Sequence, residues 1–117
     1  MTKKLGTHII LELWDIQYND RLDDMFFLQN VVRTAVDATK TTLVEIESHK
    51  FSPTGLSCIA ILKESHISIH TWPDLNYAAV DIYTCGNEAE PENAIDVFVV
   101  LLGAKHKKII SIDRGLP

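Results

Sequence analysis

The stretch 63–73 places one acid, two serines and two histidines within seven consecutive positions. An apolar run ends at Leu62 and an alternating run begins at His66, and the three residues between them fit a β-hairpin connection. We therefore expect the Glu64–Ser65 peptide bond to lie at a tight corner. There the backbone carbonyl of Glu64 can bend toward the neighbouring serine hydroxyl.

That corner suits a self-cleavage reaction. The Ser65 hydroxyl can attack the carbonyl of Glu64 and move the chain from nitrogen to oxygen, which gives an ester. A base that removes the Cα proton of Ser65 then eliminates the ester, and hydrolysis leaves a pyruvoyl group at a new N-terminus. Its ketone is an electrophile that no ordinary side chain supplies, and the surrounding protein would orient and tune it.

His70 is a candidate for that base, because an uncharged imidazole has a pKa near neutrality. It lies five residues after Ser65, so on one regular strand the two side chains would face opposite sides. Contact between them requires the strand to bend or to begin after Ser65, which the predicted hairpin provides. The alternative is that His70 is a hydrogen-bonded strand histidine.

The sequence shows no metal-ligand spacing. Cys58 and Cys85 lie 27 residues apart with no second pair, and a zinc site would need a local C-x-x-C or similar pattern. Asp23 and Asp24 can stabilise the start of a following helix, and we interpret them otherwise as solvated acids. His8, His49 and His66 could be considered as a metal cluster, but their spacings show no ligand pattern.

Hydrophobic periodicity predicts strands interrupted by two helices. The first helix begins at an N-cap of Asn19 or Asp20 and runs to about Thr39, and the second begins near Pro91 and stops at Gly103. This order favours an α+β fold, an antiparallel-rich sheet with both helices on one face, in a single domain of residues 1–117. The predicted strands are 8–14, 42–51, 56–62, 66–72, 77–84 and 107–112.

Composition limits the function classes. The formal net charge of −5 argues against nucleic-acid or anionic-membrane partners, which require a basic patch. The sequence begins with no apolar segment of the signal-peptide type, and no apolar run approaches 18 residues. We therefore expect a soluble, cytosolic protein with reduced thiols.

Two ordered motifs, ESHISIHTWP at 64–73 and YAAVDIYTCG at 77–86, resemble the small prokaryotic S-adenosylmethionine decarboxylase family. The resemblance extends from Leu5 to Gly115. Members are pyruvoyl enzymes made by self-cleavage of a proenzyme at a Glu–Ser bond. The resemblance implies cleavage into chains 1–64 and 65–117, a two-layer α/β sandwich, and a homodimer of processed protomers with active sites near the interface.

The resemblance also implies roles for individual residues. Ser65 is the pyruvoyl precursor, whose ketone forms a Schiff base with the substrate amine, and His70 is the processing base. Cys85 is the acid that returns a proton to the substrate carbon after CO₂ leaves, whereas a lone cysteine is otherwise a small buried hydrophobe. Ser57 helps to polarise the scissile carbonyl, against the alternative of a strand-start serine without function.

Two further residues bear on the substrate. Phe51 matches a residue that stacks on adenine, although a phenylalanine there also fits a core position. Asp74 stands where the family usually has a glutamate that binds the ribose hydroxyls. The resemblance therefore implies an S-adenosylmethionine decarboxylase that makes the aminopropyl donor for spermidine. Because Asp74 is one methylene shorter, a decarboxylase of ornithine or arginine stays an alternative, and an unprocessed regulatory homologue is a third.

Overall fold

The computed structural model describes residues 4–116, which form two short 3₁₀ helices, two α-helices and six strands. In chain order the elements are β1 (Gly6–Ile16), η1 (Asn19–Asp23), α1 (Met25–Ala38), β2 (Leu43–Lys50), β3 (Leu56–Leu62), β4 (Ser65–Trp72), η2 (Pro73–Leu75), β5 (Tyr77–Cys85), α2 (Asn93–Leu102) and β6 (Ala104–Arg114).

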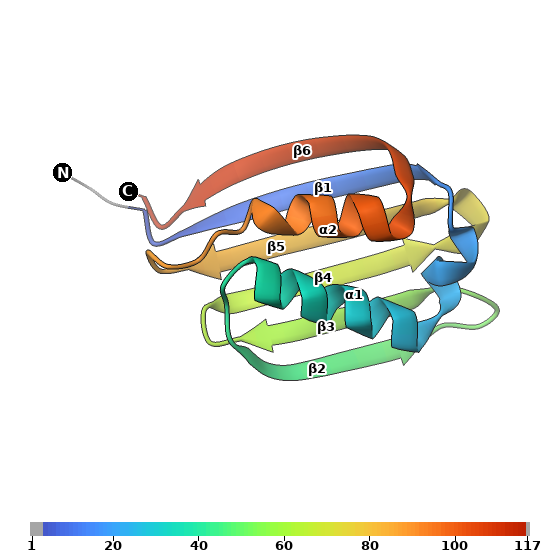
Figure 1. Ribbon diagram of the computed structural model, residues 1–117, viewed down its shortest axis with the longest axis horizontal. Helices are drawn as coiled ribbons and strands as arrows, with labels where there is room; N and C mark the ends of the chain where they lie inside the picture. The colour runs from blue at the N-terminus through green and yellow to red at the C-terminus, as the bar shows by residue number, and fades with distance from the viewer. Residues whose placement is uncertain (1–3, 117) are drawn as a thin grey trace.

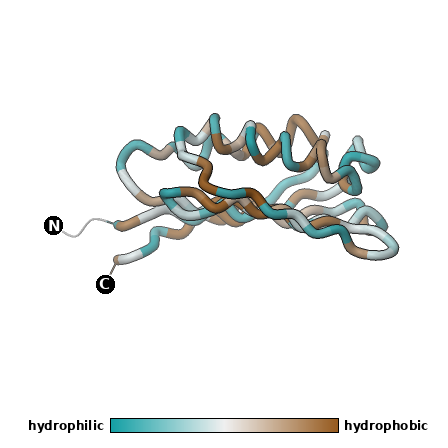
Figure 2. Tube along the Cα trace, turned by 90° about the horizontal axis from the view of Figure 1, so that it is seen from below, coloured by the Kyte–Doolittle hydropathy of each residue, from teal (hydrophilic) through white to brown (hydrophobic). Residues whose placement is uncertain are grey.

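The six strands form one sheet in the order β2-β3-β4-β5-β1-β6, and every neighbouring pair is antiparallel. Figure 1 shows α1 and α2 lying side by side across the sheet. Seen edge-on in Figure 2, both helices cover the same face and the other face is bare. The α+β sandwich expected from the sequence is confirmed.

The start of α1 differs from the prediction. The helix begins after Asp24, whose side chain accepts a hydrogen bond from the backbone N–H of Phe27 at 3.0 Å, the usual contact of an N-cap. The predicted N-cap at Asn19 or Asp20 is wrong, because residues 19–23 form η1 instead. The side chain of Asn19 donates to the carbonyl of Pro73 at 2.8 Å, a tertiary contact that draws it away from capping.

The end of α2 is as predicted. Gly103 has a φ of +70° and its N–H bonds to the carbonyl of Val99 at 2.9 Å, a left-handed stop that favours glycine. The strands β1 and β6 are longer than expected and pair along almost their whole length, from Gly6 with Arg114 to Ile16 with Ala104.

Alternation along the strands divides the sheet into a core face and an open face. In β3, Cys58 and Ala60 are buried beneath the helices, while Ile59 is 39 % exposed and Ile61 44 %. Such a half-exposed apolar face on a sheet is a common sign of a partner. Other large apolar side chains at open-face positions are Trp14, Trp72, Ile110 and Ile112. No helix among residues 4–116 is long and apolar enough to cross a membrane.

Candidate active site

The Glu64–Ser65 bond lies at the β3–β4 turn, where β4 begins. Ser65 has a φ of +137°, a conformation that residues with a side chain rarely adopt. The carbonyl oxygen of Glu64 accepts a hydrogen bond from the backbone N–H of Cys85 at 2.7 Å. The structure thus confirms the tight corner and places a donor on the carbonyl that the serine would attack.

Cys85 also presents its thiol to the corner. Its Sγ lies 3.4 Å from the Oγ of Ser65, because β4 pairs Ser65 with Thr84, the residue before it. A hydrogen bond between the Tyr83 hydroxyl and the Cys85 thiol is the main cause that raises the pKa of Tyr83 above its usual range. A serine hydroxyl, a thiol and a phenol therefore lie together at this end of the sheet.

Gly6 makes room for the thiol from the neighbouring strand. It pairs with Cys85 across β1 and β5, and a Cβ on Gly6 would lie 3.2 Å from the sulfur and 2.5 Å from the carbonyl oxygen of Thr84. The second distance is too short for packed atoms, so only glycine fits here. A glycine at a strand position often marks a close backbone approach, which was the one sequence signal for this residue.

The carboxylate of Glu64 ties the corner to the start of β2. Its two oxygens accept from the backbone N–H of Thr42 at 3.0 Å and from the Thr42 hydroxyl at 3.4 Å. In return, the N–H of Lys63 donates to the carbonyl of Thr42 at 3.0 Å. The peptide bond next to the serine is therefore held from both sides, and nothing in the sequence pattern pointed to Thr42.

His70 and Ser57 meet at a second cluster. They pair across β3 and β4, and the Nδ1 of His70 lies 2.7 Å from the Oγ of Ser57. Both line a cavity of about 380 Å³, which is roomy enough for part of a small ligand. Phe51 and Asp74 also line it, and the other lining residues are Thr54, Gly55, Leu56, Thr71 and Trp72.

Phe51 and Asp74 are free to contact a ligand in this cavity. Phe51 is 49 % exposed, so the alternative of a core phenylalanine is wrong. Its ring meets that of His49 edge-on, with 4.6 Å between centroids. Asp74 lies exposed in η2. An aromatic face and a carboxylate thus border one opening.

Within one chain, the two clusters lie at opposite ends of the sheet. β4 already includes Ser65 and runs to Trp72, so the prediction that the strand begins after Ser65 is wrong. Five residues of extended strand separate Ser65 from His70 by about 16 Å. Figure 1 shows the β3–β4 turn and the end of β5 at one end of the sheet, and η2 with the β2–β3 loop at the other. Within one chain, Ser65 therefore lies near Cys85 and His70 lies near Ser57, but the two pairs are far from each other.

The other histidines contact aromatic rings or carboxylates. His8 lies 3.0 Å from the Oδ1 of Asp81, and the ring of His66 packs on Tyr83. Among residues 4–116, no three histidine, cysteine, aspartate or glutamate side chains group closely enough to hold a metal ion.

Comparisons with known proteins agree on one family. Residues 7–115 match the family described as S-adenosylmethionine decarboxylase. The S-adenosylmethionine decarboxylase proenzyme of Methanococcus maripaludis is 45 % identical over 97 % of this chain and 93 % of its own length. The proenzyme of Thermomicrobium roseum is 43 % identical over 97 % of each.

A solved structure extends the likeness to three dimensions. The crystal structure of the adenosylmethionine decarboxylase from Aquifex aeolicus superposes with a TM-score of 0.91 at 32 % identity, covering 99 % of this chain and 95 % of that one. With the full-length family match and the relatives above 40 % identity, the chain belongs to the S-adenosylmethionine decarboxylase family.

Proposed function

We propose that this chain is a proenzyme that cleaves itself between Glu64 and Ser65 and then acts as a pyruvoyl-dependent S-adenosylmethionine decarboxylase, a carboxy-lyase. The observation that carries this is the serine of φ +137° whose preceding carbonyl oxygen already accepts the N–H of Cys85 at 2.7 Å. The relatives are named as proenzymes of that enzyme, which supports both the processing step and the substrate.

In processing, the Oγ of Ser65 attacks the carbonyl carbon of Glu64, a C–O ester bond forms and the C–N bond breaks. The N–H of Cys85 stabilises the negative charge on the carbonyl oxygen during the attack, and the cleavage releases the strained backbone of Ser65. A base then removes the Cα proton of Ser65, and the main-chain carboxylate of Glu64 leaves as the new C-terminus. Hydrolysis of the product releases ammonia. Chains 1–64 and 65–117 result.

The residues around Ser65 fit the cofactor that this reaction would leave. A pyruvoyl group there supplies a ketone that binds the substrate amine and draws off the electron pair left by CO₂. Cys85 lies 3.4 Å from the Ser65 oxygen, so its thiol is placed to return a proton to the substrate carbon.

We place the nucleoside part of the substrate in the cavity lined by Phe51 and Asp74. The half-exposed ring of Phe51 offers a face for adenine, and the carboxylate of Asp74 offers acceptors for the ribose hydroxyls. Ornithine and arginine have no nucleoside that would use the aromatic face and the ribose acceptors together. The names of the relatives also favour S-adenosylmethionine over these amino acids.

A second copy of the chain would complete the site. Ser65 and His70 are too far apart within one chain, and the open face of the sheet exposes Ile59, Ile61 and Trp72. If two such faces stack against each other, a twofold axis can lie between them and run perpendicular to the strands. This axis brings the Ser65 end of each copy over the His70 end of the other. In this homodimer His70 and Ser57 of one chain serve the cleavage of the other, with His70 as the base and Ser57 on the carbonyl.

The product would be the aminopropyl donor for spermidine, which assigns the protein to polyamine biosynthesis. A cytosolic location stays a prediction from the thiol chemistry, since Cys85 must remain a free thiol to donate its proton.

Denaturing mass spectrometry of the purified protein tests the processing step. We expect a chain of residues 1–64 and a second chain that begins with a pyruvoyl group, while Ser65→Ala stays intact because no hydroxyl is left to attack. A wild-type protein that remains a single intact chain after long incubation at neutral pH would rule out self-cleavage.

A further inference from the structure

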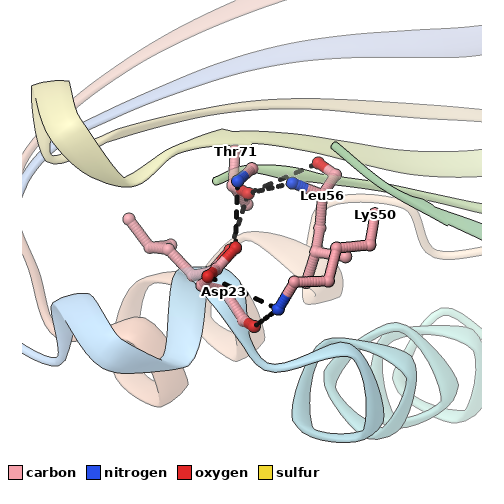
Figure 3. A network of polar contacts seen from close by, with 6 residues as sticks. Asp23, Lys50, Leu56 and Thr71 are labelled. Carbon is pink, nitrogen blue, oxygen red and sulfur yellow. Dashed lines mark hydrogen bonds and ion pairs between the residues drawn. The ribbon is translucent and has the colours of Figure 1, made fainter. Parts of the chain in front are cut away.

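A network of polar contacts ties η1 to the loop between β2 and β3 (Figure 3). The Oδ1 of Asp23 accepts a hydrogen bond from the backbone N–H of Gly55 at 2.9 Å. The Oδ2 of Asp23 lies 3.5 Å from the Nζ of Lys50, which also donates to the Asp23 carbonyl at 3.2 Å. The interpretation of Asp23 as a solvated acid is therefore wrong, since its side chain is only 29 % exposed and its oxygens face the loop.

Asp23 holds Gly55 at a position where the loop is pressed against β4. Gly55 has a φ of +108°, and a Cβ there would lie 3.1 Å from the carbonyl oxygen of Thr71. The carbonyl of Gly55 in turn accepts the N–H of Phe51 at 2.8 Å. The carboxylate is therefore linked to Phe51 through a single residue.

Thr71 extends the same network under the cavity. Its buried hydroxyl donates to the carbonyl of Leu22 at 2.7 Å and accepts from the N–H of Leu56 at 2.9 Å. Leu56 precedes Ser57 and Thr71 follows His70, so the residues beside the His70–Ser57 pair are fixed by η1. Figure 3 shows Thr71 and Leu56 above Asp23, and the side chain of Lys50 reaching down from beside Leu56 to Asp23.

We propose that Asp23 is a positioning residue for nucleoside binding, an inference that rests on the function proposed above. By accepting the Gly55 N–H and pairing with Lys50, it holds the loop 51–55 closed, so that the ring of Phe51 stays on the wall of the 380 Å³ cavity. Asp23 does not line the cavity and acts only through Gly55.

Steady-state kinetics with S-adenosylmethionine test this role. Asp23→Ala should raise KM roughly tenfold, since a charge-assisted hydrogen bond is worth about a factor of ten in an equilibrium. The kcat should stay within about twofold, because Asp23 acts only on the loop that binds the nucleoside and contacts neither Ser65 nor Cys85. Asp23→Asn should restore most of the affinity, because an amide oxygen can still accept from Gly55.

Asp20→Asn is the matched control, because Asp20 is exposed in the same 3₁₀ helix and loses the same charge. It should leave KM and kcat unchanged. An Asp23→Ala enzyme with wild-type KM, or one whose kcat falls as much as its affinity, would overturn the positioning role. So would an Asp23→Asn enzyme as impaired as Asp23→Ala.

If Asp23→Ala does not fold, Asp23→Glu carries the test. It keeps the charge and only displaces the acceptor, so KM should rise while kcat is kept, and a wild-type KM would overturn the inference. Phe51→Ala separates this result from the proposed function. If KM rises in Phe51→Ala but does not change in the Asp23 variants, only the role of Asp23 is refuted. If KM is normal in both Phe51→Ala and Asp74→Ala, the nucleoside site is refuted and the positioning role with it.

Discussion

At the scale of single residues, Cys85 makes two contacts that the proposed function assigns to different reactions. Its backbone N–H donates to the Glu64 carbonyl, a contact proposed to serve cleavage, and its thiol lies against the Ser65 hydroxyl, a contact proposed to serve decarboxylation. A substitution changes the thiol and leaves the backbone donor in place. Processing and turnover can therefore be separated at one position.

We predict that Cys85→Ala and Cys85→Ser still cleave but lose most decarboxylation. Removing a positioned general acid typically lowers the rate about 10²–10⁴-fold. Mass spectrometry reports the cleaved chains and CO₂ release from S-adenosylmethionine reports turnover. Normal turnover in Cys85→Ala would show that the thiol only fills space beside Gly6.

Asp74 offers a second test, of substrate choice. Asp74→Ala should raise KM for S-adenosylmethionine sharply, because the ribose hydroxyls lose their acceptor, while Asp74→Glu should be mild. Ornithine and arginine should be much poorer substrates of the unmodified enzyme in the same CO₂ assay. A preference for either amino acid would mean that the shorter carboxylate marks a different substrate.

At the scale of elements, the strands and helices follow from side-chain periodicity. The alternation of β4 and the apolar run of β3 predicted their hairpin, and Gly103 predicted the end of α2. The start of α1 could not be predicted, because Asn19, Asp20 and Asp24 all suit an N-cap. Only the contact between Asn19 and Pro73, 54 residues apart, decides among them.

The candidate site divides in the same way. Motif residues such as Ser65 and His70 could be named from the sequence, because a serine hydroxyl and an imidazole have a recognisable reactivity. Thr42 and Asp23 could not, because what matters is a partner 22 or 32 residues away that no local pattern reveals. The separation of Ser65 from His70 within one chain could not be predicted, because the local pattern of 63–66 suggested a strand that begins after Ser65, whereas the ladder of β4 already includes Ser65.

The interior of β3 carries a prediction about alkaline pH. Cys58 is buried, and burial raises the pKa of its thiol. A raised folded-state pKa means that its contribution to the free energy of unfolding is complete below the unfolded value of about 8.5 and is lost as pH rises above it. Urea unfolding between about pH 8 and 10 should show a decline that Cys58→Ala reduces. Equal declines in both proteins would contradict this.

At the scale of the whole molecule, the proposed division of the site between two chains predicts complementation. Ser65→Ala should not cleave, and His70→Ala should cleave slowly. In a mixed dimer, the Ser65 of the His70→Ala chain meets the intact His70 of its partner, so that chain should be cleaved. Coexpression with two different tags, followed by mass spectrometry, measures this, and an uncleaved His70→Ala chain in isolated mixed dimers would contradict the shared site.

The strand order β2-β3-β4-β5-β1-β6 has a consequence for the proposed cleavage at Glu64–Ser65. Residues 1–64 own β1, β2 and β3, and residues 65–117 own β4, β5 and β6, so β1 is enclosed between two strands of the other fragment. The strands of the two fragments are interleaved, and the fragments can separate only if the hydrogen bonds of β1 with β5 and with β6 break. Before cleavage, refolding is a unimolecular reaction of one chain. After it, two chains must find each other, and the severed bond cannot re-form, so maturation would exchange reversible folding for an assembly that lasts only while it stays folded.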